Sequence, residues 1–442
     1  MKREIYNQLL KWKVSHTRKP LMLYGARQVG KTYILKEFGR NEFENFVYVN
    51  CYMNNKIAEI FERDVDPNRI IKEISLCTGH PIIPGETFLI LDEVQECPQA
   101  VASLKYFCEE MPALCVAAAG SLLGVMNMQG CSFPVGKVDI LHLYPMTFLE
   151  FLRALDENFL LQTLTDSRLT YLIDSSLDRL IDLLRQYYFS GGMPEAVKTF
   201  IDSGDLDQVR TVQNNILTAY FADIAKHAGR DAHKVRMILE AIPSQLAKEN
   251  KKFIFGAIRK GARAAEYENA IQWLVDAGLI YKVCRVTKAE LPLTFYMERE
   301  FFKIFLLDVG LLGALSNVPP QQMITANNIF KEFKGAFTEN YVVSQLESLS
   351  DCRPICYYSK DNSTLEVDFI VQYEGKVMAL EVKAEENVHS KSFRQFVTVD
   401  NAGNNLLALR VSMKGMKDQG WMTNVPLPAF LSYLKTIDSS SK

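Results

Sequence analysis

Short apolar runs alternate with helical patterns in the first part of the chain. Residues 21–24, 88–91 and 114–119 are almost entirely apolar, as are strands that are covered on both faces of a sheet. Residues 156–218 instead have Leu and Ile at three- and four-residue spacing, which is typical of amphipathic helices. The pattern predicts an N-terminal α/β domain followed by a helical region.

The hydrophobic pattern changes between residues 231 and 293. Helices with one apolar face are predicted at 235–242 and 270–275, and a further helical stretch lies between them. Residues 279–286 alternate as a strand does. Helices that close with a β-hairpin are typical of a winged helix-turn-helix, which often docks in the major groove of DNA. Winged helices also mediate protein contacts, and the pattern leaves both uses open.

Two alternating stretches near the C-terminus predict a β-hairpin. They span residues 366–372 and 376–383, and residues 374–375 between them are Glu-Gly, which favours a tight turn. Pairing Tyr373 with Lys376 across the turn sets the register of the two strands. The face of the hairpin that forms the core is then Val367, Phe369, Val371, Met378, Leu380 and Val382.

The overall composition predicts a multidomain globular protein with a local basic segment. The chain has 442 residues, of which 48% are hydrophobic, enough for two to four domains of about 150 residues each. The net charge of -2 gives no argument for nucleic-acid binding by the chain as a whole. Between residues 245 and 290, however, Lys248, Lys251, Lys252, Arg259, Lys260, Arg263, Lys282, Arg285 and Lys288 outnumber Glu249, Glu266, Glu268, Asp276 and Glu290. This excess fits phosphate contacts, and it also fits a solvated helical face.

Several features favour a cytoplasmic protein. Polar residues interrupt the first apolar stretch, so no signal-peptide core is expected. No window approaches the roughly 18 apolar residues that a membrane span requires. The nine cysteines are scattered and lack the paired Cys or His residues of a zinc site. We therefore expect reduced thiols and no membrane partner.

A phosphate-binding loop follows the first predicted strand. Residues 25–32 read G-x4-G-K-T, in which the glycines let backbone N–H groups converge on phosphate oxygens. Lys31 would reach the outer phosphates, the Thr32 hydroxyl would coordinate Mg2+, and the following helix would add the positive end of its dipole. The predicted ATP site therefore comprises Gly25, Ala26, Arg27, Gln28, Val29, Gly30, Lys31 and Thr32.

The second and third apolar runs end in residues suited to ATP hydrolysis. The second ends in Asp92 and Glu93. Asp92 would hold Mg2+ through water, while Glu93 would orient and polarise the attacking water. The third ends at Ser121, which could lie beside the γ-phosphate as a sensor or could be a plain strand end. The Asp-Glu pair alone also fits a solvated strand end, and the phosphate-binding loop is what favours the chemical interpretation.

The predicted hairpin places Asp368 opposite Glu381, and Lys383 shares their face. Two opposed carboxylates destabilise a sheet unless something compensates, as a divalent cation would. The three residues resemble the D-(x)n-E-x-K arrangement of PD-(D/E)xK nucleases, with Glu339 as the accessory acid. The resemblance implies that the three acids hold Mg2+ and that Lys383 positions or activates a water. The same register also allows an ordinary ion pair between Glu366 and Lys383.

Nearly the whole chain resembles a family of AAA-type P-loop ATPases that carry an uncharacterised C-terminal domain. The resemblance implies a helical lid after the ATPase core and a nuclease-like domain at the C-terminus. One departure is Gly136-Lys137, where the family usually has Gly-Arg, because lysine is a point charge and not a bidentate fork. The motifs that carry the resemblance are residues 25–32, Leu-Asp-Glu-Val-Gln at 91–95, Gly120-Ser121, the segment 143–151 and Gly-Gly-Met-Pro-Glu at 191–195.

Together these features predict a four-part α/β protein. Its parts are a P-loop ATPase core (1–155), a helical lid (156–225), a winged helix-turn-helix (226–320) and a restriction-endonuclease-like domain (321–442). The leading hypothesis is an ATPase whose nucleotide cycle controls a DNA-directed nuclease-like domain. The alternative is a nucleotide-dependent switch or scaffold whose C-terminal domain only binds. Whether copies assemble, and whether Arg27, Arg153 or Arg185 serves as an arginine finger, stays open.

Overall fold

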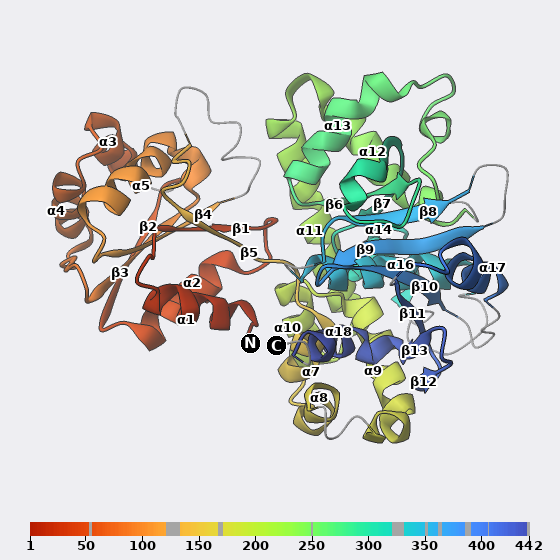
Figure 1. The fold of residues 1–442 in the computed structure, drawn as a ribbon. Coiled ribbons are helices and arrows are strands. Elements are labelled where there is room, and N and C mark those ends of the chain that lie inside the picture. The colour runs from red at the N-terminus through yellow and green to blue at the C-terminus, as the bar shows by residue number, and fades with distance from the viewer. Residues whose placement is uncertain are drawn as a thin grey trace. The chain divides into compact units, whose positions relative to one another are not determined.

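The computed structural model forms two compact units, drawn in Figure 1. Residues 2–144 and 276–278 make up the first, here called the N-terminal unit, and residues 145–275 and 279–442 the second, the C-terminal unit. No helix in the described part of the chain combines the length and apolar character needed to cross a membrane. The residues that the structure describes are 1–52, 55–120, 133–166, 171–248, 251–320, 331–349, 352–360, 365–384, 390–404 and 406–439.

A parallel sheet forms the centre of the N-terminal unit. Within the described ranges it has five strands in the order β2-β3-β4-β1-β5, and neighbouring strands all run parallel. The residues of β1, β3 and β4 are buried throughout, so the three apolar runs are confirmed as inner strands. The strands are β1 (Leu21–Tyr24), β2 (Asn45–Asn50), β3 (Thr87–Asp92), β4 (Cys115–Gly120) and β5 (Asp139–His142).

Helices cover both faces of this sheet, which is why its inner strands are continuously apolar. Phe88 of β3 contacts Phe38 of α2 on one face, with ring centroids 5.7 Å apart. On the other face, Leu89 belongs to one buried cluster with Ile70 of α4 and Leu104 of α5. The helices are α1 (Ile5–Val14), α2 (Lys31–Glu42), α3 (Asn55–Arg63), α4 (Pro67–Thr78) and α5 (Pro98–Glu110).

The carboxyl ends of the strands meet at one edge of the sheet because all of them run parallel. Tyr24, the last residue before the phosphate-binding loop, pairs with Gly120, and Asp92 pairs with Ala119. Since β4 lies between β1 and β3, this edge brings the ends of the three apolar runs together.

The C-terminal unit combines helices with a mixed sheet. Thr147 and Glu150 form a capping box that begins its first helix. The predicted helices at 235–242 and 270–275 are confirmed as parts of α12 and α13, with Ile238 and Leu274 fully buried. The helices are α7 (Phe148–Ala154), α8 (Asn158–Thr165), α9 (Leu177–Ser190), α10 (Pro194–Ser203), α11 (Leu206–His227), α12 (Ala232–Leu246), α13 (Ala264–Asp276), α14 (Val309–Leu315), α16 (Lys331–Glu347), α17 (Lys391–Gln395) and α18 (Phe430–Ser439).

The sheet of this unit crosses one of the predicted domain boundaries. In the described chain it has eight strands in the order β12-β13-β11-β10-β9-β8-β6-β7 (Figure 1). The hairpin predicted as a wing is β6 and β7, and β6 also pairs in parallel with β8. The wing is therefore continuous with the C-terminal strands, and the four predicted domain ranges stay predictions. The strands are β6 (Ile280–Val286), β7 (Met297–Leu306), β8 (Ile355–Ser359), β9 (Glu366–Tyr373), β10 (Lys376–Lys383), β11 (Leu406–Ser412), β12 (Lys417–Asp418) and β13 (Thr423–Pro426).

The predicted register of the β9–β10 hairpin is confirmed. Tyr373 pairs with Lys376, and the pairing continues to Phe369 with Leu380. The residues of the predicted core face are buried, but Ala379 on the opposite face is buried as well. Both faces of the hairpin are thus covered at this position, whereas Asp368 and Lys383 near its open end are partly exposed.

A buried carboxylate joins two distant segments of the C-terminal unit. Asp308 caps α14 by accepting a hydrogen bond from the Leu311 amide at 2.9 Å, and it also accepts one from the Gly192 amide at 2.6 Å. Gly191 has a φ of +68°, and a Cβ at this position would lie 2.2 Å from Asp308 Oδ1. The glycines of the 191–195 motif are therefore needed for this close approach.

Substitution of Asp308 with Ala is expected to destabilise the protein by about 2–4 kcal/mol, because two buried amides lose their acceptor. Burial raises the pKa of Asp308 to about 6, although the amides of Gly192 and Leu311 oppose the shift. Because the pKa of Asp308 is higher in the folded than in the unfolded protein, its carboxyl contributes stability at low pH. This contribution is lost as the pH rises through about 6. The difference in unfolding free energy between wild type and variant should therefore grow by about 1 kcal/mol from pH 7 to pH 5.

Urea unfolding at the two pH values measures this difference. Asp205→Ala is the matched control, since Asp205 caps α11 at the surface and its backbone hydrogen bonds lower its pKa. The contribution of Asp205 should instead weaken as the pH falls. If the difference in unfolding free energy between wild type and Asp308→Ala did not change with pH, it would contradict a raised pKa for Asp308.

Candidate functional site

The phosphate-binding loop joins β1 to α2 by a close backbone approach. A Cβ at Gly25 would lie 2.3 Å from the carbonyl oxygen of Leu143, so only glycine fits there. Gly30 has a φ of +97° and is the residue from which α2 begins. The predicted order of strand, loop and helix is confirmed, and it directs the first amides of α2 toward this loop.

Lys31 lies in the loop and is held by backbone carbonyls. Its Nζ donates to Gly25 O at 2.8 Å and to Ala26 O at 2.9 Å. Burial lowers the pKa of Lys31 to about 8, while Glu93 and Asp92 oppose that shift. The same ammonium could donate to phosphate oxygens, which are stronger acceptors than neutral carbonyls.

Thr32 and Asp92 meet at the sheet edge as predicted. Thr32 Oγ1 donates to Asp92 Oδ2 at 2.6 Å, and Tyr48 OH donates to the same oxygen at 3.0 Å. The Glu93 amide donates to Asp92 Oδ1 at 3.0 Å. A hydroxyl and a carboxylate this close fit the oxygen ligands of a Mg2+ ion at this position. Sequence reasoning missed Tyr48, which lies on neighbouring β2.

Glu93 lies directly after β3 in an unusual backbone conformation. Its φ is +54°, and the chain then makes a 3-10 turn over Val94–Glu96. This turn returns the side chain of Gln95 to Glu93, so that Gln95 Nε2 donates to Glu93 Oε2. Non-glycine residues in the left-handed region often occur at functional sites.

Arg3 supports the loop from the N-terminal segment. It is 7% exposed, and its guanidinium donates to Val29 O at 3.0 Å and to Tyr144 O at 2.6 Å. Sequence reasoning missed this residue, because its partners lie 26 and 141 positions away. Arg3 therefore helps to fix the phosphate-binding loop against the end of β5.

Other predicted positions of the nucleotide site are less well defined. Arg27 is partly exposed and Gln28 is exposed. Ser121 lies outside the described residues, so its role as a sensor stays a prediction. Lys137, which stands where the family usually has arginine, pairs with Glu109 of α5 at 2.9 Å.

Three residues of the predicted acidic site lie on the β9–β10 hairpin, near the start of β9 and the end of β10: Asp368, Glu381 and Lys383. Asp368 Oδ2 accepts a hydrogen bond from the Val382 amide at 2.7 Å, and Lys383 Nζ lies 3.1 Å from Glu381 Oε1. The alternative ion pair between Glu366 and Lys383 is wrong, because Lys383 pairs within its own strand. Glu366 instead pairs with Lys303 of β7 at 2.6 Å.

Glu339 of α16 is buried beside two lysines that precede it in the chain, Lys251 and Lys303 of β7. Lys251 Nζ pairs with its Oε1, and Lys303 Nζ lies 4.0 Å from its Oε2. Burial alone would raise the pKa of Glu339, but Lys251 and Lys303 outweigh it and keep the pKa below its ordinary value. Lys251, a candidate for phosphate contact, is thus engaged with a carboxylate and its side chain is only 14% exposed.

Lysines lie beside the acids of this site. Among the described residues, no group of three or more His, Cys, Asp or Glu side chains is arranged to hold a metal ion. Positive charge in the acidic site comes instead from Lys251, Lys303 and Lys383. The role of Glu339, Asp368 and Glu381 as Mg2+ ligands therefore stays a prediction.

Burial and the nearby charge of Glu339 raise the pKa of Asp368 to about 7. Glu381 has further partners that sequence reasoning missed: Ser390 Oγ donates to its Oε2, and Arg410 donates to that Oγ at 3.2 Å. The acidic site is thus a polar network in which Glu339 and Glu381 are buried, while Asp368 and Lys383 are partly exposed.

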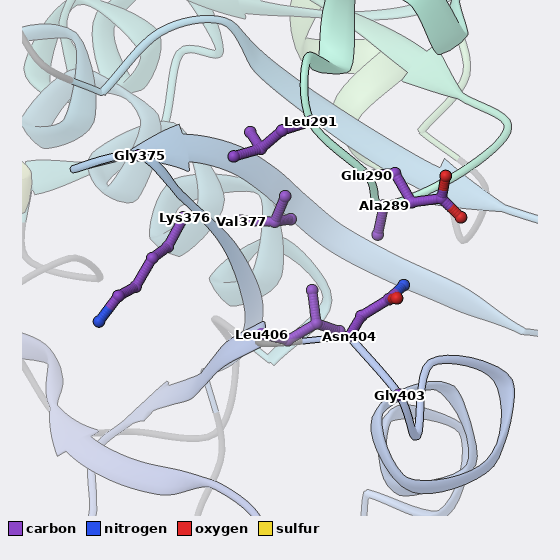
Figure 2. A pocket seen from close by; sticks show the side chains of 9 residues that line it. All are labelled: Ala289, Glu290, Leu291, Gly375, Lys376, Val377, Gly403, Asn404 and Leu406. Atoms are coloured by element: carbon purple, nitrogen blue, oxygen red, sulfur yellow. The ribbon is translucent and has the colours of Figure 1, made fainter.

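A separate hollow of about 300 Å3 lies at the turn between β9 and β10 (Figure 2). Its lining includes Glu290, Lys376 and Asn404. Figure 2 shows the Lys376 side chain pointing away from Glu290. Because its charged groups do not converge, we assign no ligand to it.

Three family descriptions match successive parts of the chain. Residues 17–152 match the family described as AAA domain. Residues 181–322 match Domain of unknown function (DUF8612), and residues 334–430 match Domain of unknown function (DUF4143). No curated protein matches the chain. The first match supports an AAA-type, nucleotide-binding ATPase for the N-terminal unit.

Three solved structures are similar to parts of this chain at low sequence identity. The Walker-type ATPase PABY2304 of Pyrococcus abyssi is 15% identical with a TM-score of 0.46, covering 71% of this chain and 95% of its own. Cdc6p from Pyrobaculum aerophilum is 13% identical with a TM-score of 0.27, covering 73% and 94%. A single-site variant of RuvB from Thermotoga maritima is 13% identical with a TM-score of 0.27, covering 62% and 86%. These TM-scores are low, and the fold is therefore described from its own strands and helices.

Proposed function

We propose that the N-terminal unit binds ATP together with Mg2+ and hydrolyses it. The observation that carries the proposal is the meeting of the phosphate-binding loop with the acidic end of β3, where Thr32 Oγ1 and Asp92 Oδ2 are 2.6 Å apart. The half-buried ammonium of Lys31 lies in the same loop. The AAA-domain match of residues 17–152 supports the same conclusion.

Each residue has a defined task in this reaction. Lys31 and the loop amides bind phosphate oxygens, and Ser121 is the proposed sensor of the γ-phosphate. Thr32 and Asp92 would hold Mg2+, which would supply positive charge to offset the negative charge that develops during phosphoryl transfer. Glu93 polarises the attacking water and accepts its proton. The water oxygen forms a bond to the γ-phosphorus, the bond from that phosphorus to the ADP oxygen breaks, and ADP and phosphate leave.

Phosphate release from ATP by the full chain tests this proposal. Turnover is expected in Mg2+ and should stop when EDTA removes the cation. Metal-independent turnover, or none with a folded protein, would argue against the proposed site.

For the C-terminal unit we propose that the nucleotide cycle controls a nuclease-like domain directed at DNA. The grouping of Asp368, Glu381 and Lys383 at the strand ends supports this proposal. The exposed Arg259 and Arg263 of the proposed winged helix support contact with DNA. The lysines paired with the acids favour the second candidate, a nucleotide-dependent switch or scaffold that binds without cleaving.

Two further parts of the proposal concern the setting of the protein. We propose a cytoplasmic protein, and an assembly of identical copies in which one copy supplies an arginine to the ATP site of the next. Sedimentation with and without ATP tests the assembly.

Incubation of DNA with the wild-type protein separates the two candidates for the C-terminal unit. Linear and supercoiled DNA are tested with and without ATP, in Mg2+ and in Mn2+, beside an Asp368→Ala/Lys383→Ala variant. Cleavage that the variant loses supports the nuclease, and its dependence on ATP reports on coupling. Retention of DNA without cleavage, alongside intact ATP hydrolysis, supports the switch or scaffold.

A further inference from the structure

Gln95 has an unusual environment beside the proposed catalytic residue Glu93. Its Nε2 donates to Glu93 Oε2, whereas its Oε1 is buried and has no hydrogen-bond partner among the described residues. Buried polar atoms almost always have a partner, so this exception at the proposed nucleotide site points to a group that the site gains when it is occupied.

The orientation of this amide follows from its neighbour. A carboxylate only accepts hydrogen bonds, so the NH2 group of Gln95 must face Glu93 and its oxygen must face elsewhere. The backbone fixes this arrangement, because the Glu96 amide donates to Glu93 O at 3.0 Å and the Cys97 amide donates to Val94 O at 3.0 Å. The 3-10 turn therefore presents Gln95 Oε1 as a preformed acceptor.

Glu93 lies next to the residues that meet the phosphate-binding loop. It directly follows Asp92, whose Oδ2 accepts a hydrogen bond from Thr32 of the loop at 2.6 Å, and its own amide donates to Asp92 Oδ1 at 3.0 Å. The amide of Gln95 is therefore attached at the acidic end of β3, beside the residues proposed to hold Mg2+. A glutamine that orients the attacking water is a known solution in other phosphoryl-transfer sites.

We propose that Gln95 is a positioning residue for ATP hydrolysis: its amide N–H group fixes the Glu93 carboxylate, and its Oε1 accepts a hydrogen bond from the attacking water. Glu93 accepts one proton of that water, and Gln95 Oε1 accepts a hydrogen bond from its second O–H group. A lone pair of the water oxygen is then directed at the γ-phosphorus. Gln95 exchanges no proton and forms no covalent bond. This inference rests on the proposed hydrolysis of ATP and adds to it the means by which the water is aligned.

Gln95→Met tests the inference, because it keeps the size of the side chain and removes both the donor and the acceptor. The variant should lower kcat by about tenfold to a hundredfold, since small misplacements of a reacting group cost that much. KM for ATP and the affinity for a non-hydrolysable ATP analogue should stay within about twofold of wild type, because Gln95 contacts no phosphate. Binding of ADP with aluminium fluoride, which mimics the transferring phosphoryl group, should weaken along with kcat.

Two comparisons make the outcome unambiguous. Gln99→Met, a glutamine four residues further on in α5, should behave as wild type. Gln95→Glu keeps an acceptor but places a second carboxylate beside Glu93, so it should not restore kcat. Wild-type kcat for Gln95→Met would overturn the inference, as would a parallel loss of kcat, analogue affinity and thermal stability. An inactive wild-type protein would remove the proposed function as well, whereas an active wild type beside a fully active Gln95→Met removes this inference alone.

Discussion

Lys31→Ala is expected to abolish ATP turnover and to weaken ATP binding by about a hundredfold or more. The Lys31 ammonium is half-buried, and it donates two hydrogen bonds within the phosphate-binding loop. Removing one charged donor from a preformed phosphate site usually costs a factor of about a hundred to a thousand. Titration with a fluorescent ATP analogue measures the loss of affinity.

Arg40→Ala is the matched control for this substitution. Arg40 is an exposed cation in the last turn of the same helix, α2. It should leave affinity and turnover near wild type, which separates loss of the phosphate contact from loss of positive charge on the helix. Retention of wild-type affinity by Lys31→Ala would place the nucleotide elsewhere.

Lys303→Met is expected to lower the free energy of unfolding by about 3–5 kcal/mol, because the half-buried Glu366 loses its partner and the buried Glu339 keeps only Lys251. Lys303 is 1% exposed and pairs with Glu366 at 2.6 Å and with Glu339 at 4.0 Å. Burial alone would lower the pKa of Lys303, but Glu339 and Glu366 outweigh it and raise the pKa above its ordinary value. The lysine is therefore charged in the folded protein, and chemical unfolding measures its loss.

Two variants test the cause of this loss. Lys376→Met removes an exposed lysine from the same sheet and should change the free energy of unfolding little. Adding Glu366→Gln to Lys303→Met should restore part of the stability, since it removes one of the unpaired charges. A stability change for Lys303→Met no larger than that for Lys376→Met would contradict the proposed ion-pair network.

The nucleotide site could be predicted largely from the sequence, because its signals are local. Residues 25–32 and Asp92 directly follow continuous apolar runs, and buried parallel strands bring such positions to one edge. The register of the β9–β10 hairpin was likewise predictable, because a two-residue turn sets it.

The missed residues act through contacts across long stretches of sequence. Arg3 reaches Tyr144, and Asp308 reaches Gly192 across 116 positions. Two of the three lysines of the acidic site come from outside the predicted C-terminal domain, since Lys251 and Lys303 both precede residue 321. The wing hairpin was predicted as a local element, but its pairing with β8 depends on a strand about 70 residues away. Neither the hydrophobic periodicity nor a motif within one segment indicates contact partners so far away in the sequence.

Steady-state phosphate release from ATP by the wild type, Lys31→Ala and Arg40→Ala, measured side by side in Mg2+, tests the central claim most directly. The structure predicts turnover by the wild type and by Arg40→Ala, and background release by a folded Lys31→Ala. Equal release by all three proteins, or none from a folded wild type, would contradict ATP hydrolysis at this site.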